Sequence, residues 1–219
     1  MAQPQPAPDP RPAPRLYLIT PAVEEVAPLA AALGRALAAA DVAAVLLRLK
    51  PADERSLINR AKALAGAVQP GGTALLLDGR ADLVARAGAD GAHLTGIEAF
   101  TAALDQLKPS RIAGCGGLKS RHDAMLAGER GADYVMFGEP DASGRRPAFA
   151  AVVERVAWWA ELFEVPCVAF AASTREIAPL VEAGADFVAF SDLPWDDPHA
   201  LGEAVTALAA QLAVPEAVA

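Results

Sequence analysis

Two cations separated by one residue are the first candidates for chemistry in this sequence of 219 residues. Arg48 and Lys50 alternate with leucines, and alternate residues of a strand share a face, so both side chains are expected on one face of a strand's end. An arginine fork beside a lysine point charge suits a phosphate or a diphosphate. Ion pairs with Asp53 or Glu54 are the structural alternative, and the pattern leaves both interpretations open.

Carboxylates that follow predicted strands could hold a divalent cation. The candidates are Asp78, Asp82, Glu98 and Glu139. Magnesium prefers oxygen ligands and commonly uses one or two carboxylates together with substrate phosphates and water. Asp78 and Glu98 would come from neighbouring strands, which favours this pair. However, Asp78 followed by Gly79 is also a common turn, and a glutamate is favourable in the first turn of a helix.

A glycine pair follows the fifth predicted strand. Gly116 and Gly117 open a loop before a helical pattern, where backbone N–H groups could hold an anion, although two glycines often only permit a turn. His93 lies within a strand pattern and is expected to be a hydrogen-bonded structural residue. Neither cysteine, Cys115 or Cys167, has a partner that would make it a nucleophile, and the three histidines form no triad pattern, so nucleophilic catalysis is not indicated.

The composition excludes several classes of protein. A net charge of -8 has the wrong sign for a protein that binds nucleic acid through its phosphates. Two cysteines argue against a disulfide framework, so a cytoplasmic location is expected. The longest apolar run, residues 165–172, is shorter than the roughly 20 residues of a membrane-spanning helix. Residues 1–14 carry a proline at every second position from Pro4 onward and are expected to be a disordered tail.

The elements that must position these residues alternate along the chain. Short apolar runs alternate with stretches of helical period, such as Val23, Val26, Leu29, Leu33 and Leu37, which predicts repeated strand–helix units. Residues 20–23 are read as the first turn, and this turn lacks the glycines of a dinucleotide-binding fold. The sequence therefore predicts one (βα)8 barrel over residues 15–214. Its expected strands are residues 16–19, 42–47, 74–77, 91–94, 112–115, 134–137, 167–170 and 187–190.

A repeated joint supports the same fold. The tripeptide Gly-Ala-Asp begins at Gly88, Gly131 and Gly184, each time after a helical pattern and before an apolar strand. Each glycine suits the left-handed conformation that ends a helix, and each aspartate leads the chain into the next strand. Recurrence of one joint favours a closed barrel over an open sheet.

These motifs carry a family resemblance. In their order and spacing, residues 16–20, 48–50, 88–94 and 131–134 resemble the thiamine phosphate synthase and thiazole tautomerase family, over residues 15–191. The resemblance implies a (βα)8 barrel and a Mg²⁺-dependent transferase of thiamine biosynthesis. Such an enzyme joins hydroxymethylpyrimidine diphosphate to thiazole phosphate with loss of diphosphate, mostly through charge stabilisation and positioning. It also implies small phosphorylated substrates and a possible homo-oligomer, with neither nucleic acid nor membrane as a partner.

The resemblance implies roles for individual residues. Arg48, Lys50 and Arg146 would be catalytic, and Asp78 and Glu98 would bind the metal. Asp78 stands one place before the family's metal aspartate, which is Gly79 here, and is expected to face the other side of the strand. Substrate contacts would be made by Arg48, Lys50, Asp78, Gly116, Ser143, Ala171, Ala172 and Ser191.

Several positions depart from the family's pattern. Hydrogen-bonding or flexible residues of the family are replaced by Leu46, Gly96, Gly116, Ala171 and Ala172. The charges are thus largely kept while specific hydrogen-bonding groups are lost. The sequence therefore predicts a thiamine phosphate synthase-like transferase, and the alternative is a catalytically inactive barrel of the same family that binds a phosphorylated ligand or a partner. A weaker third possibility is another phosphate-ester barrel enzyme.

Overall fold

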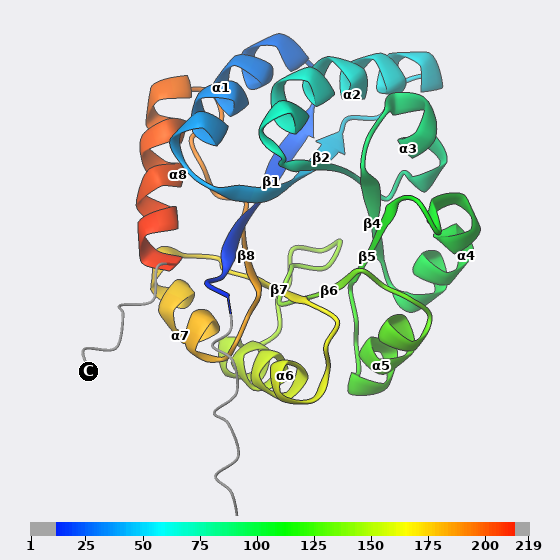
Figure 1. Cartoon of the computed structure of the whole chain (residues 1–219), viewed down its shortest axis with the longest axis vertical. Coiled ribbons are helices and arrows are strands. Elements are labelled where there is room, and N and C mark those ends of the chain that lie inside the picture. Colours follow the sequence, from blue (N-terminus) through cyan, green and yellow to red (C-terminus); the bar gives the residue numbers. More distant parts are fainter. Residues whose placement is uncertain (1–11, 213–219) are drawn as a thin grey trace, which may run out of the picture.

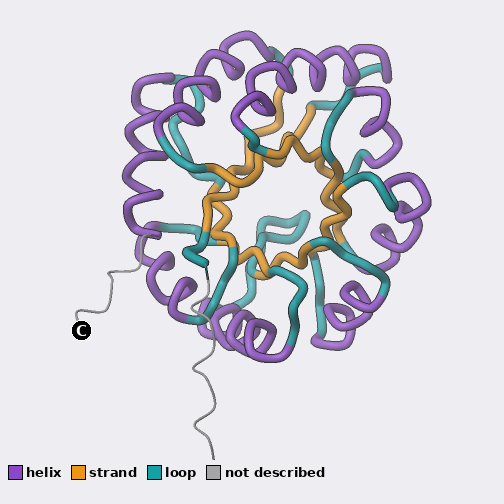
Figure 2. The backbone as a smooth tube through the Cα atoms, in the orientation of Figure 1, coloured by secondary structure: helices purple, strands orange, loops and turns teal. Residues whose placement is uncertain are grey.

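Eight parallel strands close into a barrel in the computed structural model, which describes residues 12–212 (Figure 1). The helices lie outside the ring of strands (Figure 2). The strands are β1 (Arg15–Val23), β2 (Val42–Leu49), β3 (Ala74–Asp78), β4 (Gly91–Thr95), β5 (Ile112–Gly116), β6 (Tyr134–Phe137), β7 (Cys167–Phe170) and β8 (Phe187–Phe190). The helices are α1 (Val26–Ala39), α2 (Glu54–Val68), α3 (Ala81–Ala87), α4 (Ile97–Leu107), α5 (Arg121–Glu129), α6 (Phe149–Leu162), α7 (Ile177–Glu182) and α8 (Pro198–Leu212).

Each strand pairs in parallel with its neighbour along the chain, and β1 pairs with β8 to close the ring. The predicted (βα)8 barrel is therefore confirmed. None of the helices in the described part of the chain is long and apolar enough to cross a membrane. Residues 1–11 and 213–219 lie outside the described residues, so the expected disordered tail stays a prediction.

The strands have two buried faces, which separates the hydrophobic residues into two clusters. The larger cluster fills the space between the strands and the helices and includes Leu18, Leu47 and Trp159. The smaller cluster lies inside the barrel and includes Tyr17, Leu46 and others from alternate strand positions. Because side chains alternate along a strand, the interior-facing residues of β2 and β3 continue as Arg48 and Asp78 at the carboxyl ends of these strands, and His93 lies in the middle of β4.

The Gly-Ala-Asp joints clamp the amino-terminal end of the barrel. All three glycines are left-handed, with φ of 70°, 88° and 92° at Gly88, Gly131 and Gly184. After each, the aspartate bonds twice to one residue of the preceding strand: at the first joint, the backbone N–H of Asp90 donates to the carbonyl of Leu75, and its carboxylate accepts the Leu75 N–H at 2.7 Å. Asp133 and Asp186 repeat this with Ala113 and Cys167. The repeat thus fixes the register of three strand pairs.

The first strand is longer than predicted. β1 extends to Val23, so residues 20–23 are strand rather than turn, and Val23 belongs to the strand rather than to the helical pattern. Pro21 cannot donate a backbone hydrogen bond, and the pairing of β1 with β2 shifts register between Ile19 and Ala22 around it. An irregular pairing therefore carries the strand past a residue that reads as a break in the sequence.

One connection extends over the carboxyl end of the barrel. The segment between β6 and α6 (yellow-green in Figure 1) is drawn across the opening of the ring in both views (Figure 2). Its residues Glu139, Asp141 and Arg145 line a pocket together with Thr95 at the end of β4. This connection therefore forms one wall of the region in which the strand ends meet.

Replacing Asp90 by alanine is expected to lower the free energy of unfolding by about 1–3 kcal/mol, because the Leu75 N–H and the Gln69 side-chain amide lose their acceptor. Urea denaturation measures the change. Asp105 is exposed on α4, and its replacement by alanine is a matched control that should stay within about 0.5 kcal/mol of the parent. Equal losses of unfolding free energy in the two variants would contradict the role of Asp90 in holding β3 to the joint before β4.

Candidate active site

An ion pair joins the ends of β2 and β3 at the barrel mouth. Nε of Arg48 donates to Oδ2 of Asp78 at 3.1 Å, and both side chains are about one third exposed. Asp78 therefore shares the interior face with Arg48. It follows Leu76, which β3 buries inside the barrel, by two residues. The expectation that the Asp78 side chain faces the other side of the strand is thus wrong. The terminal Nη atoms of Arg48 have no hydrogen-bond partner among residues 12–212 and remain available for an anion.

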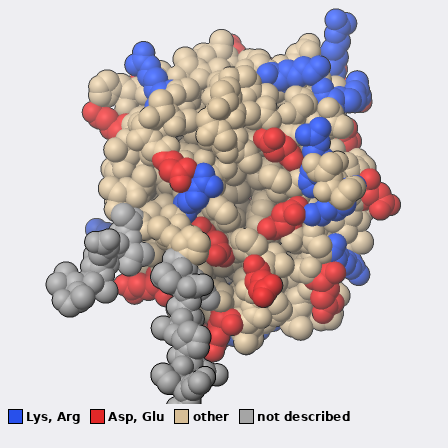
Figure 3. Space-filling view, viewed as in Figure 1, with Lys and Arg blue, Asp and Glu red and all other residues tan. Residues whose placement is uncertain are grey.

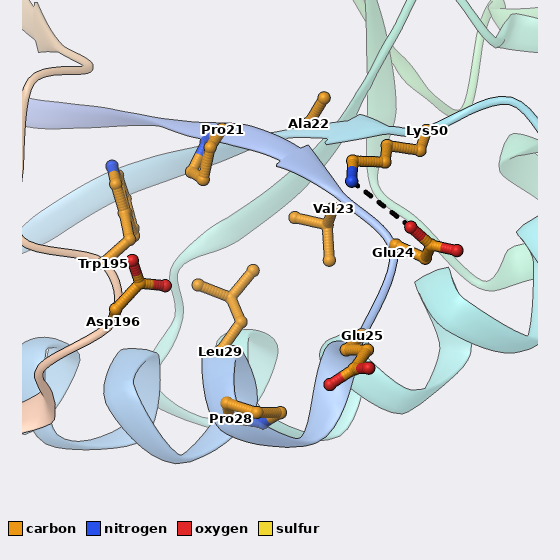
Figure 4. Close-up of a pocket in the computed structure, with 10 residues that line it drawn as sticks. All are labelled: Pro21, Ala22, Val23, Glu24, Glu25, Pro28, Leu29, Lys50, Trp195 and Asp196. Atoms are coloured by element: carbon orange, nitrogen blue, oxygen red, sulfur yellow. Dashed lines mark hydrogen bonds and ion pairs between the residues drawn. The ribbon is translucent and has the colours of Figure 1, made fainter.

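Lys50 separates from Arg48. It follows the last residue of β2, and its Nζ pairs with Glu24 at 3.2 Å beside a pocket of about 310 Å³ (Figure 4). Val23, Leu29 and Trp195 line this pocket, and Figure 4 shows Lys50 and Glu24 directed at each other beside Val23. The expected common face for the two cations is therefore not found.

The alternative partners of Arg48 and Lys50 are also engaged elsewhere. Asp53 caps α2 by accepting the Ser56 N–H, and Glu54 pairs with Arg86. The predicted ion pairs between these carboxylates and the two cations are thus wrong. Arg48 turns inward toward Asp78 of β3, Asp53 caps its own helix, and Glu54 pairs with Arg86 of α3.

A buried polar chain lies inside the barrel beneath the mouth. The Tyr17 and Tyr134 hydroxyls are 2.8 Å apart, and the Tyr134 hydroxyl is 3.0 Å from Nδ1 of His93. Tyr134 fits because Gly114 has no side chain: a Cβ there would overlap the tyrosine ring. Burial lowers the pKa of His93 to about 4, with a smaller opposing effect from Asp78, so the ring is neutral near pH 7. The expected structural histidine is interior and hydrogen-bonded.

Glu139 occupies the space that a side chain at position 116 would take. Its carboxylate accepts the Gly117 N–H, and a Cβ on Gly116 would lie less than 3 Å from Oε1 of Glu139 and from Nε2 of His93. Burial raises the pKa of Glu139, and the bond from Gly117 opposes this. The sequence offered Glu139 only as a metal candidate; the glycine at position 116 is the signal that a large side chain fills this place.

A pocket of about 570 Å³ opens beside Glu139. Four cations line it, among them the predicted Arg146 together with Lys119, Arg145 and Arg155. Lys119 is exposed and has no ion-pair or hydrogen-bond partner in the described part of the chain, whereas Arg155 donates to the Leu118 carbonyl at 2.9 Å. Lys119 and Arg155 were not among the predicted site residues, because only the tertiary fold brings α6 next to the loop after β5.

Arg146 is held by the protein on every side. It donates to the carbonyls of Gly138 and Phe170, lies over the Phe170 ring, and forms a fork with Glu176 at 3.1 and 3.3 Å. The same glutamate accepts the Ala172 N–H at 2.8 Å. Arg146 and the Ala172 N–H are donors that the resemblance assigned to substrate, and here both bind an internal carboxylate.

The other predicted substrate contacts are dispersed around the mouth. Ser143 bonds to Asp141 in the β6–α6 connection, and Ala171 is buried with its N–H on the Ala189 carbonyl. Ser191 follows β8, where its carbonyl accepts the Trp195 indole N–H. Within residues 12–212 no residue other than glycine has a positive φ, so alanines at 171 and 172 cause no left-handed strain.

The two predicted metal ligands are not part of a preformed cluster. Glu98 is exposed in the first turn of α4, and Asp78 holds Arg48 through one oxygen. The described residues contain no group of three or more histidine, cysteine, aspartate or glutamate side chains that could hold a metal ion. Acidic and basic side chains are interspersed over the face seen in Figure 3 rather than separated by sign.

Acidification should destabilise the protein through His93. Its folded-state pKa of about 4 lies below the ordinary value of 6.5, so between these values only the unfolded chain binds the proton. This stability is complete above pH 6.5 and is lost as the pH falls toward 4. Between pH 7 and pH 4.5 the free energy of unfolding should fall by about 2.5 kcal/mol more than in a His93→Phe variant, measured by urea denaturation at both pH values. Parallel pH profiles for the two proteins would contradict a neutral, buried imidazole.

Arg146 is expected to stabilise the fold. Replacing it by lysine removes the fork to Glu176 and the carbonyl bonds, at a cost of about 1–3 kcal/mol in unfolding free energy. Arg145 is the matched control, because it is exposed and pairs only with residues of its own loop. Thermal and urea unfolding should show lower stability for Arg146→Lys and unchanged stability for Arg145→Lys. A larger loss of stability in Arg145→Lys would disprove the stabilising role of Arg146.

Comparison with known proteins places this barrel in a family. A family model described as thiamine monophosphate synthase matches residues 16–192. A thiamine-phosphate synthase of Rhodospirillum centenum is 42% identical over 194 residues, covering 87% of this chain and 94% of that protein. One from Hyphomonas neptunium is 39% identical over 223 residues, covering 97% and 98%.

Solved structures agree on the fold. A thiamine phosphate pyrophosphorylase from Pyrococcus furiosus superimposes with a TM-score of 0.72 at 23% identity, covering 90% of this chain and 95% of that one. A 3-hexulose-6-phosphate synthase gives 0.69 at 14% identity, covering 90% and 100%. The resemblance read from the motifs is confirmed: the chain belongs to the thiamine monophosphate synthase family.

Proposed function

We propose that this protein is a thiamine-phosphate synthase that joins hydroxymethylpyrimidine diphosphate to thiazole phosphate. Family membership and the shared name of relatives at 35–42% identity support this transferase activity. The carbon–oxygen bond to the diphosphate breaks with both electrons leaving on the diphosphate, and the thiazole nitrogen gives its lone pair to the pyrimidine methylene carbon. No proton is transferred in these steps, so the site needs charge stabilisation and positioning rather than a nucleophile.

The observation that carries this proposal is the arrangement of two cationic side chains with free donor atoms at one end of the barrel. Arg48 binds Asp78 through Nε and leaves both Nη atoms without a partner among residues 12–212, and Lys119 lines the neighbouring pocket, also without a partner among those residues. Two such groups suit two anions, the leaving diphosphate and the phosphate of the thiazole. We assign Arg48 to the diphosphate, with Lys50 able to join it by leaving the exposed pair with Glu24.

The neighbouring pocket would take the thiazole phosphate. Lys119 and Arg155 lie on its walls, and Arg145 is exposed at its edge. Arg146 is proposed as a positioning residue, since its donors are used by carbonyls and Glu176, which hold the β6–α6 connection next to β7. The remaining proposed substrate contacts end or follow strands at the same end of the barrel: Gly116, Ser143, Ala171, Ala172 and Ser191.

Magnesium is the cofactor that family membership implies, and Asp78 fits it best. One oxygen of Asp78 binds Arg48, while the other has no partner in the described chain and lies at the mouth. A single carboxylate is sufficient when diphosphate oxygens and water complete the coordination. We propose Asp78 as the main ligand and the exposed Glu98 as a second one. When bound, Mg²⁺ would neutralise charge on the leaving diphosphate.

One observation favours the inactive alternative. The Ala172 N–H and the Arg146 fork, donors that suit a phosphate, already bind Glu176. A barrel that had lost its substrate would tolerate such a contact. The assay below separates the two, because an inactive barrel binds thiamine phosphate without forming it.

Purified protein given both substrates and Mg²⁺ should form thiamine phosphate, followed as fluorescent thiochrome. Replacing Asp78 by asparagine should lower kcat at least about tenfold and raise the Mg²⁺ concentration needed for half-maximal rate, because the carboxylate charge is lost. Glu98→Gln is the matched comparison and should have a smaller effect. Product absent from a folded parent protein would reject the synthase assignment, and equal kinetics for parent and Asp78→Asn would reject Asp78 as a ligand.

A further inference from the structure

An apolar pocket of about 250 Å³ opens at the amino-terminal end of the barrel. Its walls come from the amino-terminal parts of the strands, for example Arg15 at the start of β1, Ala74 at the start of β3 and Phe187 at the start of β8. Because the strands are parallel, this end lies opposite the mouth to which the proposed reaction is assigned. The pocket is therefore separate from the candidate active site.

Small side chains in two neighbouring strands create the space. Ala44 of β2 and Ala74 of β3 are directly paired and line the pocket, Ala44 as a member of the hydrophobic cluster inside the barrel and Ala74 packed against it. Barrel interiors of this kind are usually filled by valine, isoleucine and leucine. Two methyl groups at this level leave part of the interior unfilled, and this volume forms the pocket.

Aromatic side chains form much of the remaining wall. Tyr17, Tyr134 and Phe187 line the pocket, and the Tyr17 and Tyr134 rings pack edge to face with centroids 5.8 Å apart. The hydroxyls of the two tyrosines bond to each other, and that of Tyr134 also bonds to His93, so their polar atoms already have partners. The tyrosines thus contribute apolar ring surface, against which a further aromatic ring packs favourably.

Two charged side chains line the pocket among residues 12–212, and both are already paired. Arg15 donates to both carboxylate oxygens of Asp41, at 2.8 and 2.7 Å. Asp133 accepts Nζ of Lys108 at 2.6 Å and the Ala113 N–H at 2.7 Å. A charged ligand would have to compete with these pairs and lose its own hydration beside apolar walls, which costs free energy. The pocket therefore favours an uncharged ligand.

We propose that this pocket is a binding site for a small uncharged aromatic molecule, which packs against the Tyr17 and Tyr134 rings over Ala44 and Ala74. An apolar cavity of about 150 Å³ is large enough for benzene. A pocket of about 250 Å³ admits a larger ring system, such as the fused rings of indole. This inference goes beyond the proposed function, because it concerns the opposite end of the barrel and holds whether or not the chain forms thiamine phosphate.

The test titrates indole calorimetrically into the full chain. We expect saturable binding at a single site, and at least about tenfold weaker binding of indole-3-acetate, which carries a carboxylate on the same ring system. Pyrophosphate, a probe for the mouth, should change the affinity for indole by less than about twofold, because the two sites share no contacts. Absence of saturable indole binding, equal binding of the two indoles, or competition by pyrophosphate would overturn the proposal.

A leucine at position 74 fills the pocket. Ala74→Leu adds an isopropyl group to the wall and should lower the affinity for indole at least about tenfold, because the densely packed interior leaves no other place for the ring. Ala102→Leu is the matched control, since it makes the same change at an exposed position of α4 and should bind indole like the parent. Equal indole affinities of the two variants would contradict this location.

Nuclear magnetic resonance of the parent protein locates the ligand without a substitution. Tyr134 lines the pocket, and its hydroxyl is 3.0 Å from Nδ1 of His93, so indole should shift the ring-nitrogen signals of His93. His122 and His199 are exposed on α5 and α8 and serve as internal controls. Indole binding that leaves His93 unchanged, or that shifts His199 from the groove between α1 and α8, would overturn the proposal.

Discussion

Closure of the sheet is the constraint on which the rest of this structure depends. A closed parallel barrel turns every second side chain of each strand into a narrow interior, so polar residues at those positions must find partners there or reach the mouth. The tyrosine–histidine chain and the Arg48–Asp78 pair are the two solutions seen. The first lies fully buried and the second lies at the rim, where an anion can compete with Asp78 for the guanidinium.

The interior chain links stability to the site. The Tyr17 and Tyr134 hydroxyls bond to each other and hold His93 through Nδ1, with Nε2 of His93 next to Gly116. Glycines make this packing feasible, since a side chain at Gly114 would overlap Tyr134 and one at Gly116 would displace Glu139. The cost of burying polar groups is therefore offset by hydrogen bonds, which also fix the orientation of the His93 ring beneath the mouth.

Charge at the mouth is balanced by the chain itself. Each cation that the motifs singled out has a carboxylate beside it: Asp78 for Arg48, Glu24 for Lys50 and Glu176 for Arg146. The pairs differ in accessibility, because the Lys50 pair is more than half exposed while the Arg146 pair is about one fifth exposed. The cation of an exposed pair can leave its carboxylate for a substrate anion at little cost in free energy, whereas breaking a partly buried Arg–carboxylate pair costs more.

The sequence by itself determined the fold, because strand–helix periodicity and the Gly-Ala-Asp joints are local signals: a left-handed glycine ends a helix, and the aspartate bonds to the preceding strand. It also located Arg48 and Asp78 at strand ends, since alternation is a local property. It could not determine which charges pair. The places of Glu176, Lys119, Arg155 and Glu139 follow from segments of different strand–helix units, three loops or turns and helix α6, that meet only when the barrel closes. Contacts between side chains distant in sequence depend on distances that only the tertiary structure sets.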